Sequence, residues 1–115
     1  MAGFYNGVVH FAREDFATSS GENNNVEVNS TRFEVTATND MDSITGFSPP
    51  VEGALIFVIN ISATNNLVIK HLDTSSDAAN RITLWAGTDL TIEPKKMIML
   101  GYDEVNSLWH ELKLA

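Results

Sequence analysis

Three histidines are the first side chains to consider for chemistry, because imidazole serves as a metal ligand and as a general base. His10, His71 and His110 are never spaced so that one element could present two of them to a metal. His110-Glu111 resembles the start of a zinc-protease motif, but position 114 is Leu and the segment has the pattern of a strand. Since the chain also lacks cysteine, we expect no metal and no cofactor. His71 is expected to be a partly buried imidazole, hydrogen-bonded near the loop of residues 73–77.

Hydrolytic chemistry has few candidates. The nucleophile motif Gly-x-Ser-x-Gly does not occur, and the seven glycines stand too far apart for a phosphate-binding loop. Acidic pairs do occur, Asp73 with Asp77 and Asp103 with Glu104, and a glycosidase uses two carboxylates that flank a bond. In so acidic a chain, such pairs arise in loops by chance. We expect no catalytic residues, and a glycosidase would require two facing carboxylates in a cleft, about 5–10 Å apart.

Three aromatic residues could stack on sugar rings, because an aromatic face offers apolar area to the C–H groups of a sugar. For Tyr102 and Trp109 we expect core packing, with the polar tip of each side chain hydrogen-bonded at the rim. Trp85 lies next to a turn and is the best candidate for a binding site, with Asp73 and Asp77 as partners for sugar hydroxyls. A carbohydrate-binding module is therefore the alternative function.

Charge and hydropathy exclude two classes of partner. The 7 Lys and Arg residues against 15 Asp and Glu give a net charge of −8, and the cations are scattered, so we expect no nucleic-acid binding. No apolar run approaches the roughly 20 residues of a membrane helix, so we expect no membrane insertion. The N-terminus lacks the pattern of a secretion signal, which indicates a product made in the cytoplasm.

Residues 54–61 form the central apolar run, which only Asn60 interrupts. A strand with one wet face alternates apolar and polar residues, so this run predicts cover on both faces. Residues 97–100 have the same character. One cover would be an opposite sheet, and the other would be the N-terminal segment or a neighbouring copy of the chain.

The remaining pattern predicts an all-β domain. Val26, Val28, Phe33 and Val35 alternate with polar residues, and turns recur every 8–12 residues or so in the second half, as in a sandwich or barrel. The short Asn-rich connection 62–66 predicts a hairpin between residues 54–61 and 67–69. Asn6-Gly7 predicts a further hairpin, although residues 11–16 also allow one helical turn. We assign residues 1–30 to an N-terminal attachment or edge segment and residues 31–115 to the sandwich.

The order of motifs in residues 44–112 resembles a small β-domain of tailed-bacteriophage virion proteins, found in tail fibres, tailspikes and head decorations. The resemblance lies in the order and spacing of the pieces rather than in any one of them. The pieces are Ile44-Thr45-Gly46-Phe47, Asn66-Leu67-Val68-Ile69-Lys70-His71, Ala79-Asn80-Arg81-Ile82, Gly87-Thr88-Asp89-Leu90-Thr91-Ile92-Glu93-Pro94, Leu100-Gly101-Tyr102-Asp103 and Leu108-Trp109.

This resemblance implies an antiparallel, jelly-roll-like β-sandwich that assembles as a homotrimer on the virion and has no catalytic residues. It implies structural or interface roles for His71, Asn80 and Arg81, and we add Trp109. The leading hypothesis is a non-enzymatic structural protein of the particle, a head decoration, fibre or tail appendage. Its partners would be other virion proteins and, under the alternative function, a host-surface glycan. The sequence leaves open the choice between head and tail.

Overall fold

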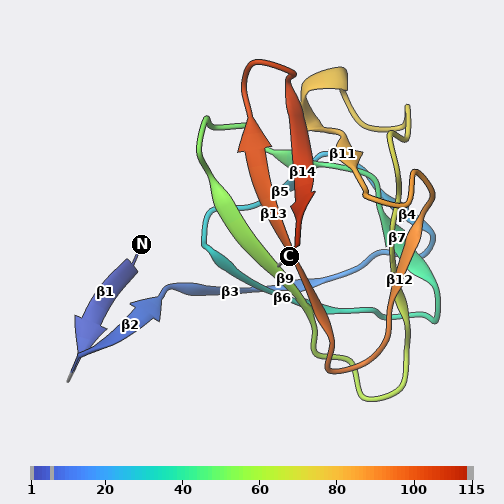
Figure 1. Cartoon of the computed structure of the whole chain (residues 1–115). Coiled ribbons are helices and arrows are strands. Elements are labelled where there is room, and N and C mark those ends of the chain that lie inside the picture. The colour runs from blue at the N-terminus through green and yellow to red at the C-terminus, as the bar shows by residue number, and fades with distance from the viewer. Residues whose placement is uncertain (1, 6, 114–115) are drawn as a thin grey trace.

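The structure is a computed structural model that describes residues 2–5 and 7–113. Figure 1 shows that these residues form short strands, with the 3-10 turn η1 (Ala78–Asn80) as the one helical element among them. The expected all-β class is confirmed. The strands do not form the expected antiparallel jelly-roll, because the sheets are mixed and several neighbouring strands run parallel.

Residues 13–69 wind as a β-solenoid, in which the chain passes three faces in turn and then returns to the first. Each return lays a strand parallel to the strand one coil earlier, which places Arg13 beside Arg32 and Arg32 beside Phe57. The strands of the first face are β3 (Arg13–Ala17), β6 (Arg32–Thr36) and β9 (Leu55–Asn60); those of the second are β4 (Glu22–Asn23), β7 (Asp42–Ile44) and β10 (Leu67–Ile69); those of the third are β5 (Val26–Glu27) and β8 (Phe47–Ser48).

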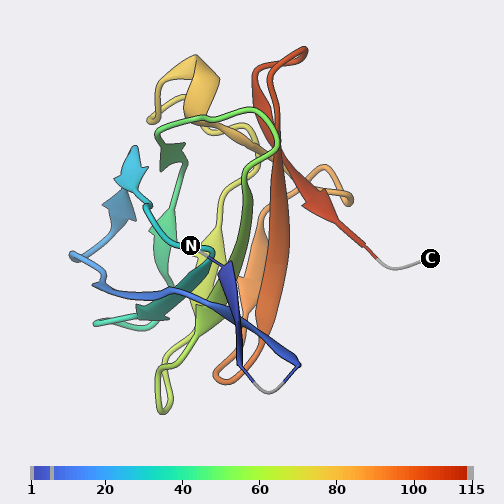
Figure 2. The same cartoon turned by 90° about the vertical axis from the view of Figure 1, so that its left-hand side faces the viewer.

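The C-terminal strands close one end of the solenoid by antiparallel pairing. Strand β12 (Leu90–Ile92) pairs with β10, β13 (Met97–Asp103) pairs with β9, and β14 (Leu108–Leu112) pairs with β13, while β11 (Ile82–Thr83) runs parallel to β14. The two main sheets have the orders β11-β14-β13-β9-β6-β3 and β12-β10-β7-β4. Figure 2 shows β13 and β14 on the C-terminal side of the molecule, away from the first coil.

The predicted hairpin between residues 54–61 and 67–69 is wrong, because β9 and β10 belong to different sheets. Asn60 is fully buried, and its side-chain amide donates to the carbonyls of Asn65 (2.9 Å) and Ile92 (2.8 Å). Its side-chain oxygen accepts from the amide of Ser62 at 3.0 Å. These bonds satisfy the backbone of a corner, so the chain passes to the next face instead of folding back.

Aromatic side chains connect the faces through the core. The ring of Phe47 contacts that of Phe33 edge-on at 5.6 Å between centroids and that of Trp109 at 6.1 Å, and Tyr102 contacts Trp109 at 5.1 Å. Trp109 is 1% exposed and donates from Nε1 to the carbonyl of Phe47 at 3.1 Å. The hydroxyl of Tyr102 donates to the carbonyl of Ala79 at 2.9 Å. Both side chains therefore pack as the sequence predicted, with bonded polar tips.

The buried carboxylate of Asp42 holds the corner between the first two coils. It accepts from the hydroxyl of Thr18 (2.7 Å) and from the amides of Gly21 and Asn39 (2.9 Å each). Burial alone would raise the pKa of Asp42, but these hydrogen bonds outweigh it, so the pKa lies below the usual 3.8. Because the folded pKa is depressed, the carboxylate stabilises the fold above pH 3.8, and this stabilisation is lost as the pH falls through the folded pKa.

Replacing Asp42 by Ala should therefore lower the free energy of unfolding at pH 7 by about 3 kcal/mol, since one buried hydrogen bond to a charged group contributes about 1.5–3 kcal/mol. The difference between wild type and Asp42→Ala should shrink below pH 3.8. Urea unfolding at several pH values measures it. Asp40→Ala is the control, since it removes a carboxylate at an exposed position that, within the described residues, accepts only from the amide of Asn66 (2.8 Å), and it should change the free energy by no more than about 1 kcal/mol. An Asp42→Ala deficit that is the same at pH 3 and pH 7 would contradict this account.

The N-terminal hairpin, hereafter the N-terminal arm, comprises β1 (Ala2–Tyr5) and β2 (Val8–Phe11) and stands off from the solenoid in Figure 1. The antiparallel pairing confirms the predicted hairpin. The alternative of a helical turn in residues 11–16 is wrong, because Arg13–Ala17 is strand β3. Gly7 has a φ of +78°, as a tight connection requires, and Asn6 lies outside the described residues. Of the segment 1–30, the first part thus projects, and β3 forms the edge strand of the six-stranded sheet.

Candidate functional site

The outer face of the six-stranded sheet carries apolar side chains where a sheet with one wet face is usually polar. Along β9 and β13, Ile56, Val58 and Leu100 point into the core and are buried. Phe57 and Met99 point outward, are half-buried and lie opposite each other in the strand register. We call this outer surface the apolar sheet face, and it consists of Leu55, Phe57, Ile59, Met97, Met99 and Leu112.

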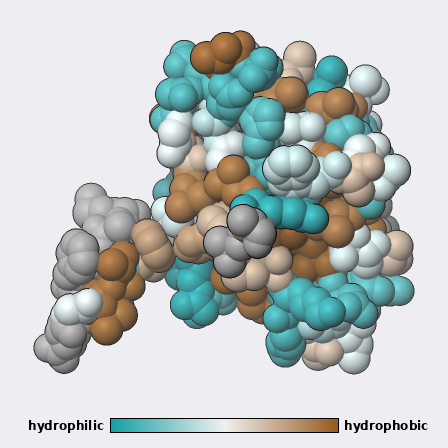
Figure 3. Space-filling view, in the orientation of Figure 1, coloured by the Kyte–Doolittle hydropathy of each residue, from teal (hydrophilic) through white to brown (hydrophobic). Residues whose placement is uncertain are grey.

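The sequence predicted that both faces of residues 54–61 would be covered. Only the side chains that point into the core are fully buried. On the outer side, the ring of Phe11 contacts that of Phe57 edge-on at 5.5 Å between centroids. Met97 is 48% exposed and Leu112 is 43% exposed. Figure 3 shows hydrophobic surface across the middle of this side of the molecule, with hydrophilic surface predominating above and below it. The apolar sheet face thus offers several adjacent apolar side chains to a partner.

Charged side chains border the apolar sheet face toward β3 and β6. Glu34 is buried, and its Oε2 lies 2.6 Å from Nε of Arg32. Arg13 lies 3.8 Å from the other oxygen of Glu34 and 3.3 Å from Asp15. The side chains of both arginines remain more than half exposed, at 58% for Arg13 and 54% for Arg32. Two arginines and two carboxylates therefore form a charge-balanced cluster at the base of the N-terminal arm, with both guanidinium groups partly exposed.

A shallow groove of about 400 Å³ borders the apolar sheet face at its β14 edge, opposite the edge that faces β3 and β6. Trp85, which is 67% exposed, forms one wall, and its backbone amide donates to Glu111 Oε1 at 2.9 Å. We call this hollow the Trp85 groove, and its lining is Trp85, Gly101, Tyr102, Asp103, His110, Glu111 and Leu112. An exposed indole among carboxylates and an imidazole can stack on a sugar ring and bind its hydroxyls.

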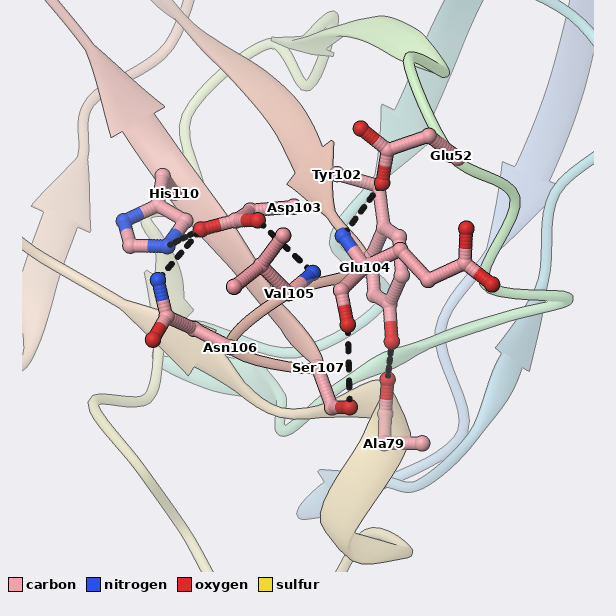
Figure 4. A network of polar contacts seen from close by, with 9 residues as sticks. All are labelled: Glu52, Ala79, Tyr102, Asp103, Glu104, Val105, Asn106, Ser107 and His110. Atoms are coloured by element: carbon pink, nitrogen blue, oxygen red, sulfur yellow. Dashed lines mark hydrogen bonds and ion pairs between the residues drawn. The ribbon is translucent and has the colours of Figure 1, made fainter.

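Figure 4 shows the polar network that shapes the turn beside the Trp85 groove. Asp103 accepts from the side-chain amide of Asn106 and from the backbone amide of Val105, and its Oδ2 lies 3.3 Å from His110 Nε2. The hydrogen bond from Asn106, the largest influence, lowers the pKa of Asp103. Glu52 accepts from the amide of Glu104. Because a glycosidase acid needs a raised pKa, Asp103 is suited to fixing the turn rather than to protonating a leaving group.

The structure places Asp73 and Asp77 away from the lining of the Trp85 groove. Asp73 accepts from the amide of Ser75 at 2.8 Å, and the hydroxyl of Ser75 donates to Glu22 at 3.0 Å. The amide of Asp77 donates to Asn25 at 2.8 Å. This loop therefore packs on the first coil, whereas the polar partners of Trp85 are His110, Glu111 and Asp103. The alternation of residues 108–112, which sets His110 and Leu112 on one side of the strand, could have indicated part of this lining.

The other predicted residues make contacts within their own chain. His71 accepts at Nδ1 from the amide of Leu84 (2.9 Å), and its own amide donates to Asp89 (2.8 Å), so its partners differ from the predicted loop 73–77. The side-chain amide of Asn80 donates to Asn25 at 2.9 Å, and Arg81 Nε donates to the carbonyl of Ser76 at 3.0 Å. The bond from Asn80 ties the loop before β11 to the solenoid, and the bond from Arg81 closes that loop on itself. A role of these residues between subunits stays a prediction.

The described part of the chain contains neither a metal-binding cluster nor a membrane-spanning helix. Among residues 2–5 and 7–113, no three His, Asp or Glu side chains converge in a way that could hold a metal ion. Nor does this part of the chain contain a helix of the length and apolar character needed to cross a membrane. Comparison with protein-family models, curated proteins and solved structures gives no match.

Proposed function

We propose that this chain is a non-enzymatic structural protein of a bacteriophage virion, made in the host cytoplasm and exposed on the particle as a homotrimer. The order of motifs in residues 44–112 supports the viral assignment. The observation that carries the assembly is the apolar sheet face, where Phe57, Ile59 and Met99 are half-buried and not enclosed by their own chain. Its partners are other virion proteins of the head or tail.

Assembly follows from the cost of leaving this surface in water. Burying a large apolar side chain contributes about 1.5–3 kcal/mol, and six such side chains adjoin one another on the apolar sheet face. The chain carries a net charge of −8, which opposes close approach of copies everywhere except at uncharged surfaces. The apolar sheet face has no charged member, so it is the surface on which copies can meet.

The viral assignment is tested on purified particles. Mass spectrometry of phage particles from cells that express this chain should detect it in a fixed ratio to the capsid protein, and a particle reconstruction should show its density about a local three-fold axis. Absence of the chain from density-purified particles would refute the assignment. Density for a single copy at each site would refute the trimer.

The second candidate function is carbohydrate binding, and the exposure of Trp85 beside His110 and Glu111 favours it. A host-surface glycan would stack on the indole, while the imidazole and carboxylate bind its hydroxyls. This function is compatible with the first, because a virion protein that attaches to a host can do so through surface sugars.

Trp85→Ala should weaken glycan binding at least about tenfold, since stacked aromatic groups rank among the residues whose truncation costs most in binding. A glycan array identifies the ligand, and calorimetry compares wild type with variant. Trp85→Phe should retain most of the affinity, and Val105→Ala, at a position 90% exposed on the β13–β14 turn, should change nothing. An array without hits, or equal affinity of Trp85→Ala and wild type, would remove this candidate.

A further inference from the structure

The N-terminal arm is the second uncovered apolar surface of the molecule. Val8 is 58% exposed, Val9 is 45% exposed and Phe11 is 38% exposed. An isolated two-stranded hairpin is at best marginally stable in water, so a projecting one needs a surface to pack on. Its own solenoid supplies little of this, because Figure 1 shows the arm standing off to one side, joined to the solenoid by a single stretch of chain.

The apolar sheet face of the same chain is only partly available to its own arm. Phe11, at the base of the arm, packs on Phe57 and so covers the β9 side of that face. The β13 and β14 side, with Met97, Met99 and Leu112, lies beyond it. One projecting apolar segment and one open apolar surface therefore occur on each copy, in different places.

Charge also matches between the two surfaces. Arg13 follows the arm after Ala12 and contacts Asp15 and Glu34 of its own chain, yet its side chain is 58% exposed and can reach a further carboxylate. The far end of β13 carries Asp103, followed by Glu104, with Glu52 bonded to the same turn. An arm that lay along β13 of another copy would thus bring the partly exposed guanidinium of Arg13 toward an acidic turn.

The spacing along the two strands agrees with this match. Val9 and Arg13 are four residues apart, as are Met99 and Asp103. At a rise of about 3.3 Å per extended residue, Met99 and Asp103 within β13 are about 13 Å apart. Val9 on β2 and Arg13 on β3, with Ala12 between the two strands, span at most about that distance. Apolar contact at Met99 and ionic contact at Asp103 can therefore form together.

We infer that the N-terminal arm of one copy docks on the apolar sheet face of the next, with Val9 over Met99 and Leu112 and with Arg13 toward Asp103. The occupant of the face is a second copy of this chain, and the inference rests on the proposed homotrimer. Since arm and face are different surfaces, the contact is heterologous, and such contacts form a ring when the rotation closes. Three copies would each give one arm and receive one.

Disulfide trapping tests the contact, because the natural chain contains no cysteine. Val9→Cys combined with Leu112→Cys should give covalent dimers and trimers on mild oxidation, and dithiothreitol should return them to monomers. Val105→Cys combined with Leu112→Cys has the same number of thiols and should give only background cross-linking. The two single variants, carrying different tags and mixed before oxidation, should form one mixed disulfide.

The outcomes separate this inference from the proposed function. A wild-type trimer without interchain disulfides in the Val9→Cys/Leu112→Cys variant would overturn the arm contact and leave the homotrimer standing. A disulfide within one chain would show that the arm folds back on its own sheet, which also overturns the inference. A wild-type monomer would remove the homotrimer and the arm contact together.

If the cysteine variants do not fold, exchanging the charges of Arg13 and Asp103 tests the same contact. Arg13→Glu and Asp103→Arg should each weaken the trimer at least about tenfold, as expected for truncated or reversed interface charges. The double variant should recover most of the wild-type concentration dependence in mass photometry. Failure of the double variant to recover, in folded protein, would overturn the pairing of Arg13 with Asp103.

Discussion

Trp109→Ala lowers the free energy of unfolding by about 3–5 kcal/mol, the range found for removal of a buried Trp or Phe side chain. Trp109 is 1% exposed and joins the solenoid to the closing strands through its contacts with Phe47 and Tyr102. Its removal also leaves the buried carbonyl of Phe47 without the indole hydrogen bond. Urea unfolding at one fixed protein concentration measures the loss, because subunit association would otherwise shift the result.

Trp109→Phe separates the hydrogen bond from the packing. It keeps an aromatic ring in the cluster and should cost about 1–3 kcal/mol, since it removes the indole donor and part of the volume. A loss below about 1 kcal/mol for Trp109→Ala would contradict the central place of this residue in the core.

Met99→Glu should abolish the proposed trimer without unfolding the subunit. Met99 lies at the centre of the apolar sheet face, opposite Phe57 on one side and Leu112 on the other. A carboxylate there is solvated in the monomer but would be desolvated and unpaired in an interface, so the trimer should weaken at least about 100-fold. Because the residue is half-exposed within its own chain, the free energy of unfolding of the monomer should change by no more than about 1 kcal/mol.

Val105→Glu is the matched control for Met99→Glu, since it adds the same charge at a position that is 90% exposed and outside the apolar sheet face. Mass photometry across a dilution series, with circular dichroism to check the fold, compares the two variants. A Met99→Glu variant that remains trimeric at the wild-type concentration would show that copies meet on another surface.

The strand content of the chain was predictable from local pattern. Residues 54–61 and 97–100 correspond to β9 and β13, and the alternation around Phe33 and Val35 corresponds to β6. The winding was not predictable in the same way, because parallel neighbours such as Arg13 and Arg32, or Arg32 and Phe57, are far apart in sequence. Their separations, 32 − 13 = 19 and 57 − 32 = 25 residues, differ, so no fixed repeat marks the coils.

The corner at residues 61–66 accounts for the wrongly predicted hairpin between residues 54–61 and 67–69. Polar Asn-rich connections signal a change of direction, but the local pattern does not distinguish a hairpin from a solenoid corner. What decides the matter is the side chain of Asn60, whose partner Ile92 is more than thirty residues away. Such long-range satisfaction of a buried amide cannot be deduced from neighbouring residues.

The candidate site was predictable in part for a similar reason. The exposure of Trp85 followed from its place beside a turn, and the outward apolar character of Phe57 and Met99 followed from the apolar runs 54–59 and 97–100. The grouping of Trp85 with His110 and Glu111 depends on the parallel pairing of β11 with β14, which brings two distant segments together. No local pattern predicts that pairing.

The central claim is that the apolar sheet face is a contact between copies of the chain. The molecular mass of the purified wild-type protein in solution tests it most directly. Sedimentation equilibrium at micromolar concentration should give three times the 12.6 kDa mass of one chain. A single species at 12.6 kDa over the whole concentration range would contradict the claim.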